Sequence, residues 1–451
     1  MVGQVSQKSM FQRFLHSQVA GSLVLVATTA VALVWANSPW AHYYFELSHT
    51  YMGITFGQWE FKLSLSHWIK DGLMAIFFFV VGLEIKREIV VGELSSREKA
   101  MLPVCAALGG AVVPAAFYAV VNLDGEGIAG WGIPMATDIA FALGVLSLFG
   151  PRVPIGLKVF LTALAIADDL LAVAVIAVFY TPDLSILPLI VAGVCIVLML
   201  VASRAGVRAT WVYTVLALLV WVDVLGSGVH ATIAGVMVAM IIPVRPSIAV
   251  GEFMDVAGSL LGQAQGKDNS RDALIHDPRR RAILWQFLLT VEDSIPPAQA
   301  LEHRLHPVSA FLILPLFALF SAGVAFSPEN LDGFPTGISL GVILGLVLGK
   351  PVGVVLAVWL TTKLTKVELK GVSMSQLLGA GCLAGIGFTM SIFISELAFT
   401  DDTLIDQAKV GILLASFAAG VAGAVVLGYA LPKEADSVPN DGRFDGQQTG
   451  P

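Results

Sequence analysis

Charged residues are scarce in this 451-residue chain, in which Asp, Glu, Lys and Arg together make up 13% of the sequence. Soluble domains carry about 25% of these residues. Together with 56% hydrophobic residues and a mean hydropathy of +0.81, this scarcity excludes an ordinary soluble domain and indicates a polytopic membrane protein. The expected surroundings are the lipid bilayer, and the net charge of −7 gives no reason to expect a nucleic-acid partner.

Cysteine is nearly absent as well. Cys105, Cys195 and Cys382 each lie in an apolar segment, with no CxxC or Cys/His spacing around them. The sequence therefore predicts neither a disulfide framework nor a zinc site, and we expect the three side chains to serve packing. No cofactor is expected.

Long apolar runs, in contrast, recur along the whole chain, and about 20 apolar residues suffice for a helix to cross a bilayer. The runs lie near residues 19–37, 64–85, 101–121, 127–149, 156–180, 184–203, 209–222, 226–244, 308–326, 337–361, 372–400 and 408–431. The predicted fold class is therefore all-α, a polytopic membrane protein with about twelve transmembrane helices. The first run could also be read as a signal peptide, but its length and the aromatic residues after it favour a span.

Basic residues alternate between the segments that connect these runs. If the N-terminus is inside, all but four of the 26 Lys and Arg residues fall on the inner side, the exceptions being Lys62, Lys70, Lys350 and Lys409. Because basic residues resist translocation, this asymmetry predicts that both termini are cytoplasmic.

The runs define one transmembrane domain over residues 19–431, between a cytoplasmic N-terminal segment, 1–18, and a disordered cytoplasmic tail, 432–451. A long cytoplasmic loop covers residues 245–306. In this loop the basic run Arg279–Arg281 precedes AILWQFLLTVED, an apolar piece too short to span. It is either an amphipathic helix near anionic lipid headgroups or a plain solvent-facing helix.

Two of the runs are interrupted near their middle. The interruptions are Pro134, Thr137 and Asp138 in the fourth run, and Gly385, Gly387 and Thr389 in the eleventh. Backbone freed at membrane depth is tolerated only where protein buries it or where it lines a cavity. Interrupted segments at matching places in two halves indicate a transporter with inverted repeats. We therefore predict that runs 3–5 and 10–12 are the repeats and that helices 4 and 11 are broken and cross.

Two adjacent aspartates, Asp168 and Asp169, lie inside the fifth run. One acidic residue at the centre of a membrane helix costs roughly 2.5–3.5 kcal/mol, so the pair indicates an ion or proton pathway. Neighbouring helix residues point about 100° apart, so one carboxylate should face the pathway more directly than the other. Two carboxylates this close titrate as a unit. A small cation that replaced their protons would make cation and proton binding mutually exclusive, which is the minimum condition for exchange.

Lys350 is the one lysine near the middle of a run, and it needs an anionic partner or a helix end at that depth. If the broken helices cross, two half-helix ends carry roughly +0.5 charge and two roughly −0.5. Asp138 would suit the positive ends and Lys350 the negative ones, either as a stabilising pair or with a proton-carrying role for Lys350. Thr137 could offer its hydroxyl to the cation, as a ligand beside Asp168 and Asp169, or bond its own backbone.

Carboxylates and imidazoles gather at the inner ends of the second and ninth runs: Glu84, Glu88, Glu302, His303 and His306. Histidine titrates near pH 6.5, so such a cluster could respond to pH. The alternative is a set of ordinary interfacial charges that pair with nearby basic residues. A lone histidine, His230, lies among small residues at the start of the eighth run and fits packing best.

The chain also contains, in this order, the motifs WIKDGLMAIFFFVVGLEIKRE, PMATDIAFALGVL, LTALAIADDL, SGVHATIAGV, LEHRLHP, LILPLFAL and GFTMSIFISELAF. They resemble the NhaA-type sodium/proton antiporters over nearly the whole chain. The resemblance implies that Asp168 and Asp169 bind Na⁺ or Li⁺ and carry the exchanged protons. It further implies roles for the unwound part of helix 4 (Thr137, Asp138), the helix 10 lysine (Lys350), a pH-responsive cluster (Glu84, Glu88, Glu302) and a pH-linked histidine (His230).

Several positions depart from the family pattern. Leu171 follows ADDL where the family commonly has glycine, and Phe320 and Ser321 replace the usual Ala and Asn before AGV. Gln299 and Ala300 stand where a basic pair often precedes LEH. The last change bears on the pH threshold more than on the transport chemistry.

The resemblance implies a transporter, not an enzyme, in a bacterial inner membrane. It would exchange cytoplasmic Na⁺ or Li⁺ for external protons, electrogenically and by alternating access, under pH regulation and for sodium and pH homeostasis. The alternatives are a pH-gated channel or uniporter, and an intramembrane aspartyl protease, which needs facing carboxylates and a GxGD motif that the chain lacks. Ion preference, activation pH, stoichiometry and a homodimeric state stay open.

Overall fold

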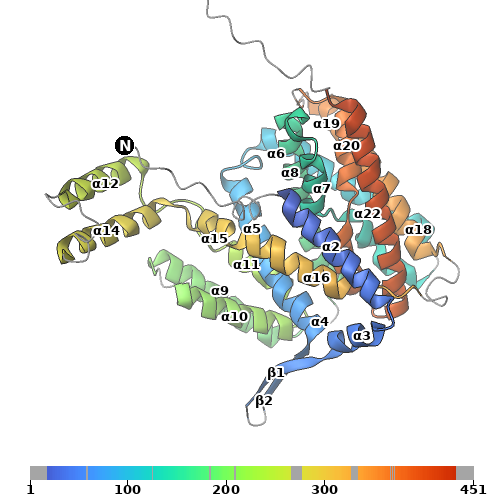
Figure 1. The fold of residues 1–451 in the computed structure, drawn as a ribbon, viewed down its shortest axis with the longest axis horizontal. Helices are drawn as coiled ribbons and strands as arrows, with labels where there is room; N and C mark the ends of the chain where they lie inside the picture. Colours follow the sequence, from blue (N-terminus) through green and yellow to red (C-terminus); the bar gives the residue numbers. More distant parts are fainter. Residues whose placement is uncertain are drawn as a thin grey trace, which may run out of the picture. The chain divides into compact units, whose positions relative to one another are not determined.

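The computed structural model describes residues 18–56, 59–123, 125–181, 184–207, 210–265, 277–326, 334–365, 367, 369 and 371–432. Most of these residues are helical (Figure 1). The predicted N-terminal segment 1–18 and tail 432–451 lie outside the described residues, apart from Gln18 and Pro432.

The chain divides into two compact units. Unit 1 comprises Met1–His16, Val24–Ala100 and Ala172–Ala325, and unit 2 comprises Ser17–Leu23, Met101–Leu171 and Phe326–Pro451. Helices α2 (Gln18–Ala36), α6 (Arg97–Val121) and α8 (Ile155–Phe179) each contribute residues to both.

Unit 1 consists of helices and one hairpin of strands. Its further elements are α3 (Ala41–His49), β1 (Tyr51–Phe56), β2 (Trp59–Ser64), α4 (Leu65–His67), η1 (Trp68–Leu73), α5 (Met74–Val90), α9 (Ile186–Arg204), α10 (Thr210–Gly226), α11 (Thr232–Ala239), α12 (Val250–Ala264), α14 (Pro278–Ser294), α15 (Pro297–Val308), η4 (Ser309–Ile313) and α16 (Leu314–Ser321). Helix α11 packs against α5, and α9 against α10. The apolar interior between α9, α10 and α11 is centred on Met199, Val220 and Val224.

The strands β1 and β2 were not predicted. They pair in antiparallel register, with Tyr51 opposite Ser64 and Phe56 opposite Trp59. The β1 sequence YMGITF and the β2 sequence WEFKLS are rich in the aromatic and β-branched residues that favour strands.

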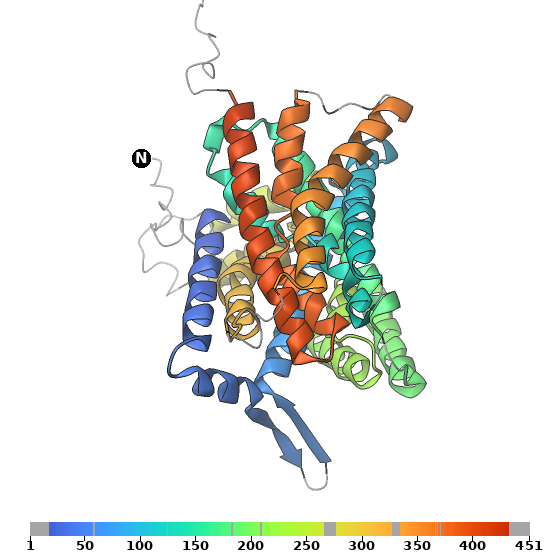
Figure 2. The ribbon, with the colours of Figure 1, turned by 90° about the vertical axis from the view of Figure 1, so that its right-hand side faces the viewer.

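Unit 2 holds the interrupted segments. Its further elements are η2 (Glu126–Met135), α7 (Ile139–Ser147), η3 (Gly150–Arg152), α18 (Gly337–Leu344), η5 (Gly345–Gly349), α19 (Lys350–Thr365), α20 (Met374–Ala384), α21 (Phe388–Ala398) and α22 (Asp402–Ala430). Helix α22, red in Figure 2, runs along α18 and α20. Helices α18, η5 and α19 follow one another without a break over the tenth predicted run.

Seven helices of the described chain are long and apolar enough to cross a membrane, and two bent pairs bring the number to nine. These cover nine of the predicted runs. The remaining three, at 64–85, 209–222 and 226–244, are helical but are not among these candidate spans. Helices α4, η1 and α5 follow one another over the first of them, α10 has 17 residues, and α11 has eight. The predicted helical membrane architecture is therefore confirmed, and about twelve spans stays a prediction.

The predicted cytoplasmic loop, 245–306, contains α12, α14 and most of α15 in its described part. Helix α14 covers the apolar piece AILWQFLLTVED that the sequence singled out, and its N-cap Asp277 accepts hydrogen bonds from the backbone N–H of Arg279 and Arg280. Helix α12, which was not predicted, packs against it.

Two glycines allow α6 and α19 to touch backbone to backbone. A Cβ added at Gly353 would collide with the carbonyl of Gly109, and the reverse holds for Gly109. Gly110, on the same stretch of α6, leaves room for the side chain of Lys350, whose Cε would lie 3.5 Å from an added Cβ. This contact therefore fixes the height at which α19 presents Lys350.

Alanine substitution should change the Tm in opposite directions at a glycine in this contact and at a glycine with free space around it. Gly353→Ala is expected to lower the Tm, because overpacking costs about 1–3 kcal/mol. Gly193→Ala in α9 is the matched control: an added Cβ there meets nothing within 4 Å, so relief from glycine flexibility should stabilise by about 0.5–1 kcal/mol. Thermal unfolding in detergent measures both, and equal shifts in one direction would contradict the contact.

Candidate functional site

Both predicted interruptions are present in unit 2. The helix pair η2 and α7 is bent by 41° around Ala136–Asp138, and the pair α20 and α21 is bent by 46° around Gly385–Gly387. Pro134 lies near the end of η2 and Thr137 and Asp138 lie in the break itself. The backbone at these breaks leaves the helical ladder and has to find hydrogen-bond partners elsewhere.

The two breaks supply these partners to each other. The backbone N–H of Asp138 donates to the carbonyl of Ile386 at 2.7 Å, and the Thr137 hydroxyl donates to the carbonyl of Ala384 at 2.7 Å. On the other side, the Ser391 hydroxyl donates to the carbonyl of Ile133 at 2.8 Å. All of these groups are buried, so the interrupted segments are in direct contact and form the centre of the site.

Asp138 lies on the N-terminal ends of both second half-helices. Its Oδ1 accepts the backbone N–H of Phe141 in α7 at 3.0 Å, which makes it the N-cap of that helix. Its Oδ2 accepts both the hydroxyl, at 2.5 Å, and the backbone N–H, at 3.2 Å, of Thr389 in α21. One carboxylate thus faces two positive helix ends.

The C-terminal ends of the first half-helices meet donors instead. The Lys350 ammonium donates to the carbonyl of Met135, the last residue of η2. The Thr137 hydroxyl covers the carbonyl of Ala384, the last residue of α20. Thr137 therefore bonds the backbone of the other broken segment, not its own, and its oxygen lone pairs stay available to a cation.

Gly385 and Gly387 give the second break its close packing. A Cβ at Gly385 would collide with the carbonyl of Leu346 in η5, and one at Gly387 would collide with the Ser391 side chain. Space therefore restricts position 385 to glycine, whereas a larger residue at position 387 would require the Ser391 side chain to move.

The two aspartates of α8 lie in different surroundings. Asp168 Oδ2 is 2.6 Å from the Lys350 ammonium, and both side chains are fully buried. The Thr137 side chain lies within interaction range of the Asp168 carboxyl, whose other oxygen, Oδ1, accepts no hydrogen bond from the described residues. Asp169 is 2% exposed. In this ion pair, Oδ1 of Asp168 is not used by Lys350. A cation that replaced the ammonium could therefore bind the Asp168 carboxylate.

The described chain holds no group of three or more His, Cys, Asp or Glu side chains arranged for a resident metal ion. A small cation at this site would be bound by the two carboxylates and by neutral oxygens such as the Thr137 hydroxyl, which are ligands that hard cations prefer. Such a small set of ligands fits a transported ion, which is bound reversibly, better than a permanently bound metal ion.

The carboxylates of the inner cluster lie together in unit 1, around one arginine. Arg87 in α5 contacts Glu302 in α15, with Nε 3.0 Å from Oε2, and also Glu88, at 2.9 Å. The other oxygen of Glu88 accepts the backbone N–H of Glu93 at 2.8 Å. Glu84, one turn before Glu88, is near enough to interact with all three charges. The structure thus brings the predicted carboxylates together and adds Arg87 as their common partner.

The predicted histidines of α15, His303 and His306, are three residues apart and both exposed. His230 Nε2 donates to the carbonyl of Tyr180 at 2.7 Å, which ties the chain before α11 to the end of α8.

The sequence did not predict the partners of two further basic residues, Lys409 and Lys86. Lys409 in α22 lies 2.9 Å from Glu396 in α21, and their side chains are 10% and 3% exposed. Lys86 donates to the carbonyls of Met240 and Ile242, just past the end of α11. A charged residue within or beside an apolar run was the available signal in both cases.

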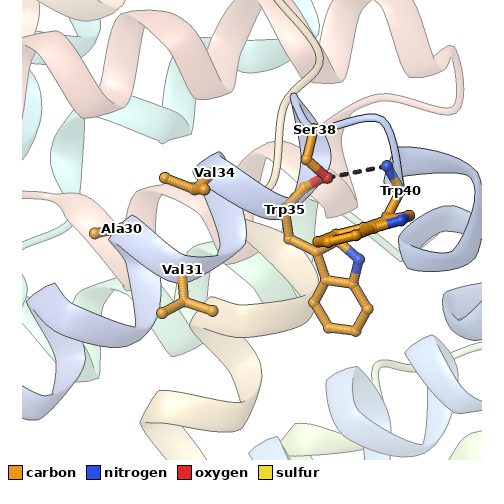
Figure 3. Close-up of a pocket in the computed structure, with 6 residues that line it drawn as sticks. All are labelled: Ala30, Val31, Val34, Trp35, Ser38 and Trp40. Carbon is orange, nitrogen blue, oxygen red and sulfur yellow. Dashed lines mark hydrogen bonds between the residues drawn. The ribbon is translucent and has the colours of Figure 1, made fainter.

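An apolar groove beside α2 is lined by Ala30, Val31, Val34, Trp35, Ser38 and Trp40 (Figure 3). Ser38 is the one residue among them with a hydroxyl, and this hydroxyl accepts a hydrogen bond from the backbone N–H of Trp40 at 3.1 Å. With no charged group in its lining, this groove is unsuited to an ion.

Comparison with known proteins agrees with this geometry. The family model for Na⁺/H⁺ antiporter 1 matches residues 12–427 of the chain. The chain belongs to the NhaA family of Na⁺/H⁺ antiporters. It is 47% identical to the Na⁺/H⁺ antiporter NhaA of Oleidesulfovibrio alaskensis over 92% of its own length and 93% of that protein, and 45% identical to the NhaA of Sulfurimonas denitrificans over 93% and 95%. As an NhaA-family protein it is a multi-pass membrane transporter, not an enzyme.

The departures from the NhaA pattern lie close to buried packing. Ser321, at the end of α16, is fully buried, whereas Phe320 and Leu171 are half-buried. Leu171 follows Asp168 by three residues, close to one turn of α8, so it lies on the same side of that helix.

Proposed function

We propose that this NhaA-family protein exchanges cytoplasmic Na⁺ or Li⁺ for external protons in a bacterial inner membrane, with both termini in the cytoplasm. The observation that carries the proposal is the buried pair of Asp168 and Lys350 beside two interrupted helices whose ends are neutralised by Asp138, Lys350 and Thr137. A site of this kind binds a cation only when something positive leaves it.

The exchange follows from competition for Asp168. With protons bound, the Lys350 ammonium neutralises Asp168 Oδ2. A Na⁺ ion that enters between Asp168 and Asp169 replaces the ammonium and the protons of the site, and the Thr137 oxygen completes its ligands. When the ion leaves to the other side, the protons return. Because the cation competes with the Lys350 ammonium and with protons for the same two carboxylates, the site holds either the cation or the protons, and the two cross the membrane in opposite directions.

The proposed transport is electrogenic. If the pair of Asp168 and Lys350 together with Asp169 takes up two protons for each cation, one net charge moves per cycle. A membrane potential contributes about 2.3 kcal/mol per charge per 100 mV, so it could drive Na⁺ out without a pH gradient. Alternating access would come from movement around the broken helix pairs, because interrupted backbone is where a packed helix bundle can rearrange.

The test uses inverted vesicles that hold a pH gradient reported by a pH-sensitive dye. Collapse of the gradient when Na⁺ or Li⁺ is added supports exchange. The same measurement with K⁺ shows how selective the exchange is among the three cations. Na⁺ flux that proceeds with no proton movement would point to the channel or uniporter instead. A parallel measurement with a potential-sensitive dye separates electrogenic exchange from electroneutral exchange.

We further propose that the cluster of Glu84, Arg87, Glu88 and Glu302 sets the pH at which exchange begins. Glu302→Gln is expected to shift the pH profile of exchange toward acid and to leave the maximal rate nearly unchanged. The reason is that the negative charge of Glu302 disfavours ionisation of the nearby Glu84 carboxyl, so its removal makes Glu84 easier to ionise.

The matched control for this prediction is Glu93→Gln, since Glu93 pairs with Lys99 at 3.5 Å on the surface nearby. Exposed pairs of this type contribute little, so its profile should stay in place. Rates of dye response measured over a pH series give both profiles. An unmoved profile in Glu302→Gln would remove the cluster from pH regulation.

A further inference from the structure

Helices α12 and α14 form a hairpin whose apolar side is left uncovered. Phe253, Ala257 and Leu260 of α12 face α14 and are half-buried or buried, and Ile283 and Phe287 of α14 face back. Large apolar side chains nevertheless stay outside this contact. They are Val250 (77% exposed), Met254 (63%) and Leu261 (51%) on α12, and Leu284 (38%), Trp285 (66%), Leu288 (45%) and Leu289 (57%) on α14.

These exposed side chains lie on one side of the hairpin, whereas Val256 of α12, 37% exposed, lies on the other. The backbone N–H of Ser247 donates to the carbonyl of Asp293 at 3.0 Å, so the start of α12 meets the end of α14 and the two helices run antiparallel. With about 100° between residues, the exposed apolar row of each helix then points to the same side. Glu252 and Asp255 of α12, and Arg279 of α14, point away from it.

The apolar side carries a cation at one end. Arg281, which is exposed, lines a shallow groove together with Leu284, Trp285, Phe287 and Leu288. It lies in the first turn of α14, where the helix end is itself positive. Arg280 is held by Asp277 at 3.7 Å, whereas Arg281 continues the apolar row. Glu292 lies in line with this row near the far end of α14, about three turns from Arg281.

The hairpin also starts and ends next to membrane spans. Its base is closed where the backbone N–H of Ala298 donates to the carbonyl of Pro243, immediately after α11 and at the start of the candidate span Pro297–Ser321. In Figure 1, α12 and α14 run across the direction of α9, a candidate span of the same unit, and not along it. A helix pair attached at a span end and directed across the spans runs along a bilayer surface.

We propose that the α12–α14 hairpin is a membrane-surface anchor: its apolar side inserts into the leaflet on the side of the 245–306 loop, and Arg281 binds the phosphate of an anionic lipid headgroup. An apolar face flanked by arginine, with the acidic residues of α12 turned away, is the pattern of an interfacial helix. The proposal is independent of the ion that the protein transports.

The test places an environment-sensitive fluorophore on either side of the hairpin in the full-length protein. Leu288→Cys labels the apolar side and Ser259→Cys, exposed on the polar side of α12, is its matched control. Both are made in a background with Cys105, Cys195 and Cys382 replaced by alanine and retained only if dye-reported exchange survives. The protein is compared in micelles, phosphatidylcholine vesicles and phosphatidylglycerol vesicles.

In phosphatidylglycerol vesicles, nitroxide-labelled lipid is expected to quench the label at 288 and not the label at 259. Iodide quenching at 288 should fall at least about threefold relative to micelles, because an interfacial helix buries its apolar face in the acyl boundary. Arg281→Gln should abolish the preference for phosphatidylglycerol over phosphatidylcholine, whereas Arg279→Gln, on the other side, should keep it.

Three results would overturn the proposal. Equal access of iodide to positions 288 and 259 in phosphatidylglycerol would mean that the apolar side stays in water. Equal lipid quenching in the two lipids would exclude the anionic headgroup. Shielding of position 288 in micelles that rises with protein concentration, with no lipid quenching, would assign the face to a second copy of the chain.

Discussion

Asparagine in place of Asp168 or of Asp169 is expected to reduce cation-dependent collapse of a pH gradient to the background of empty vesicles. Asparagine keeps the size of aspartate but carries no charge and accepts no proton in this pH range. The site would then hold neither the cation nor the protons that compete with it. The measurement is dye dequenching on addition of Na⁺ or Li⁺ to vesicles that contain equal amounts of inserted protein.

Asp223→Asn in α10 provides the matched control. Asp223 is also a carboxylate within an apolar helix, but it belongs to unit 1, outside the set of residues around the broken helices. Its exchange rate should stay close to that of the unmodified protein. If either α8 variant kept that rate while Asp223→Asn lost it, the site would have to be sought in unit 1.

The positions of the interruptions could be predicted because local chemistry decides them. Pro134 cannot continue a hydrogen-bonded ladder, and Gly385 and Gly387 weaken one. An apolar run with such residues near its centre is therefore expected to bend there. The 46° bend lies at Gly385–Gly387, and the 41° bend begins two residues after Pro134, which itself is still within η2. The carboxylates of α8 were conspicuous for a similarly local reason, their cost in an apolar helix.

The pairings could not be predicted, because they depend on how far one helix slides along another. Whether Lys350 reaches Asp168 or Asp169 follows from the height of α19 on α6, which the contact of Gly109 and Gly353 fixes. The pairing of Glu396 with Lys409 could not be predicted for the same reason, since Lys409 lies on the next helix. Sequence gives the residue types for an ion pair and leaves the register to tertiary packing.

Short irregular elements escaped prediction for a different reason. The residues of β1 and β2 lie between two apolar runs. Their aromatic side chains fit an interfacial belt of a membrane protein as well as a pair of strands, so composition alone could not decide between the two. Helix α12 was not predicted because glycines and acidic residues interrupt its sequence. Its apolar residues form a recognisable helix face only in the contact with α14.

Removal of the Lys350 charge is expected to destabilise the protein as well as to stop exchange. In Lys350→Met, Asp168 would keep a buried carboxylate without its counter-charge, and the Met135 carbonyl would lose its donor. Breaking a buried pair by removing one partner costs about 3–5 kcal/mol. The expected readout is a clear drop in Tm in detergent, together with loss of dye-reported exchange.

A double variant separates the charge from the size of the side chain. In Lys350→Met combined with Asp168→Asn no charge stays uncompensated, so much of the Tm should return, because contacting residues are not additive. Exchange should stay absent, since the cation has lost a carboxylate ligand. A double variant as unstable as Lys350→Met would mean that the packing of the lysine chain against α6, and not its charge, stabilises the site; recovered exchange would mean that neither side chain of the pair takes part in transport.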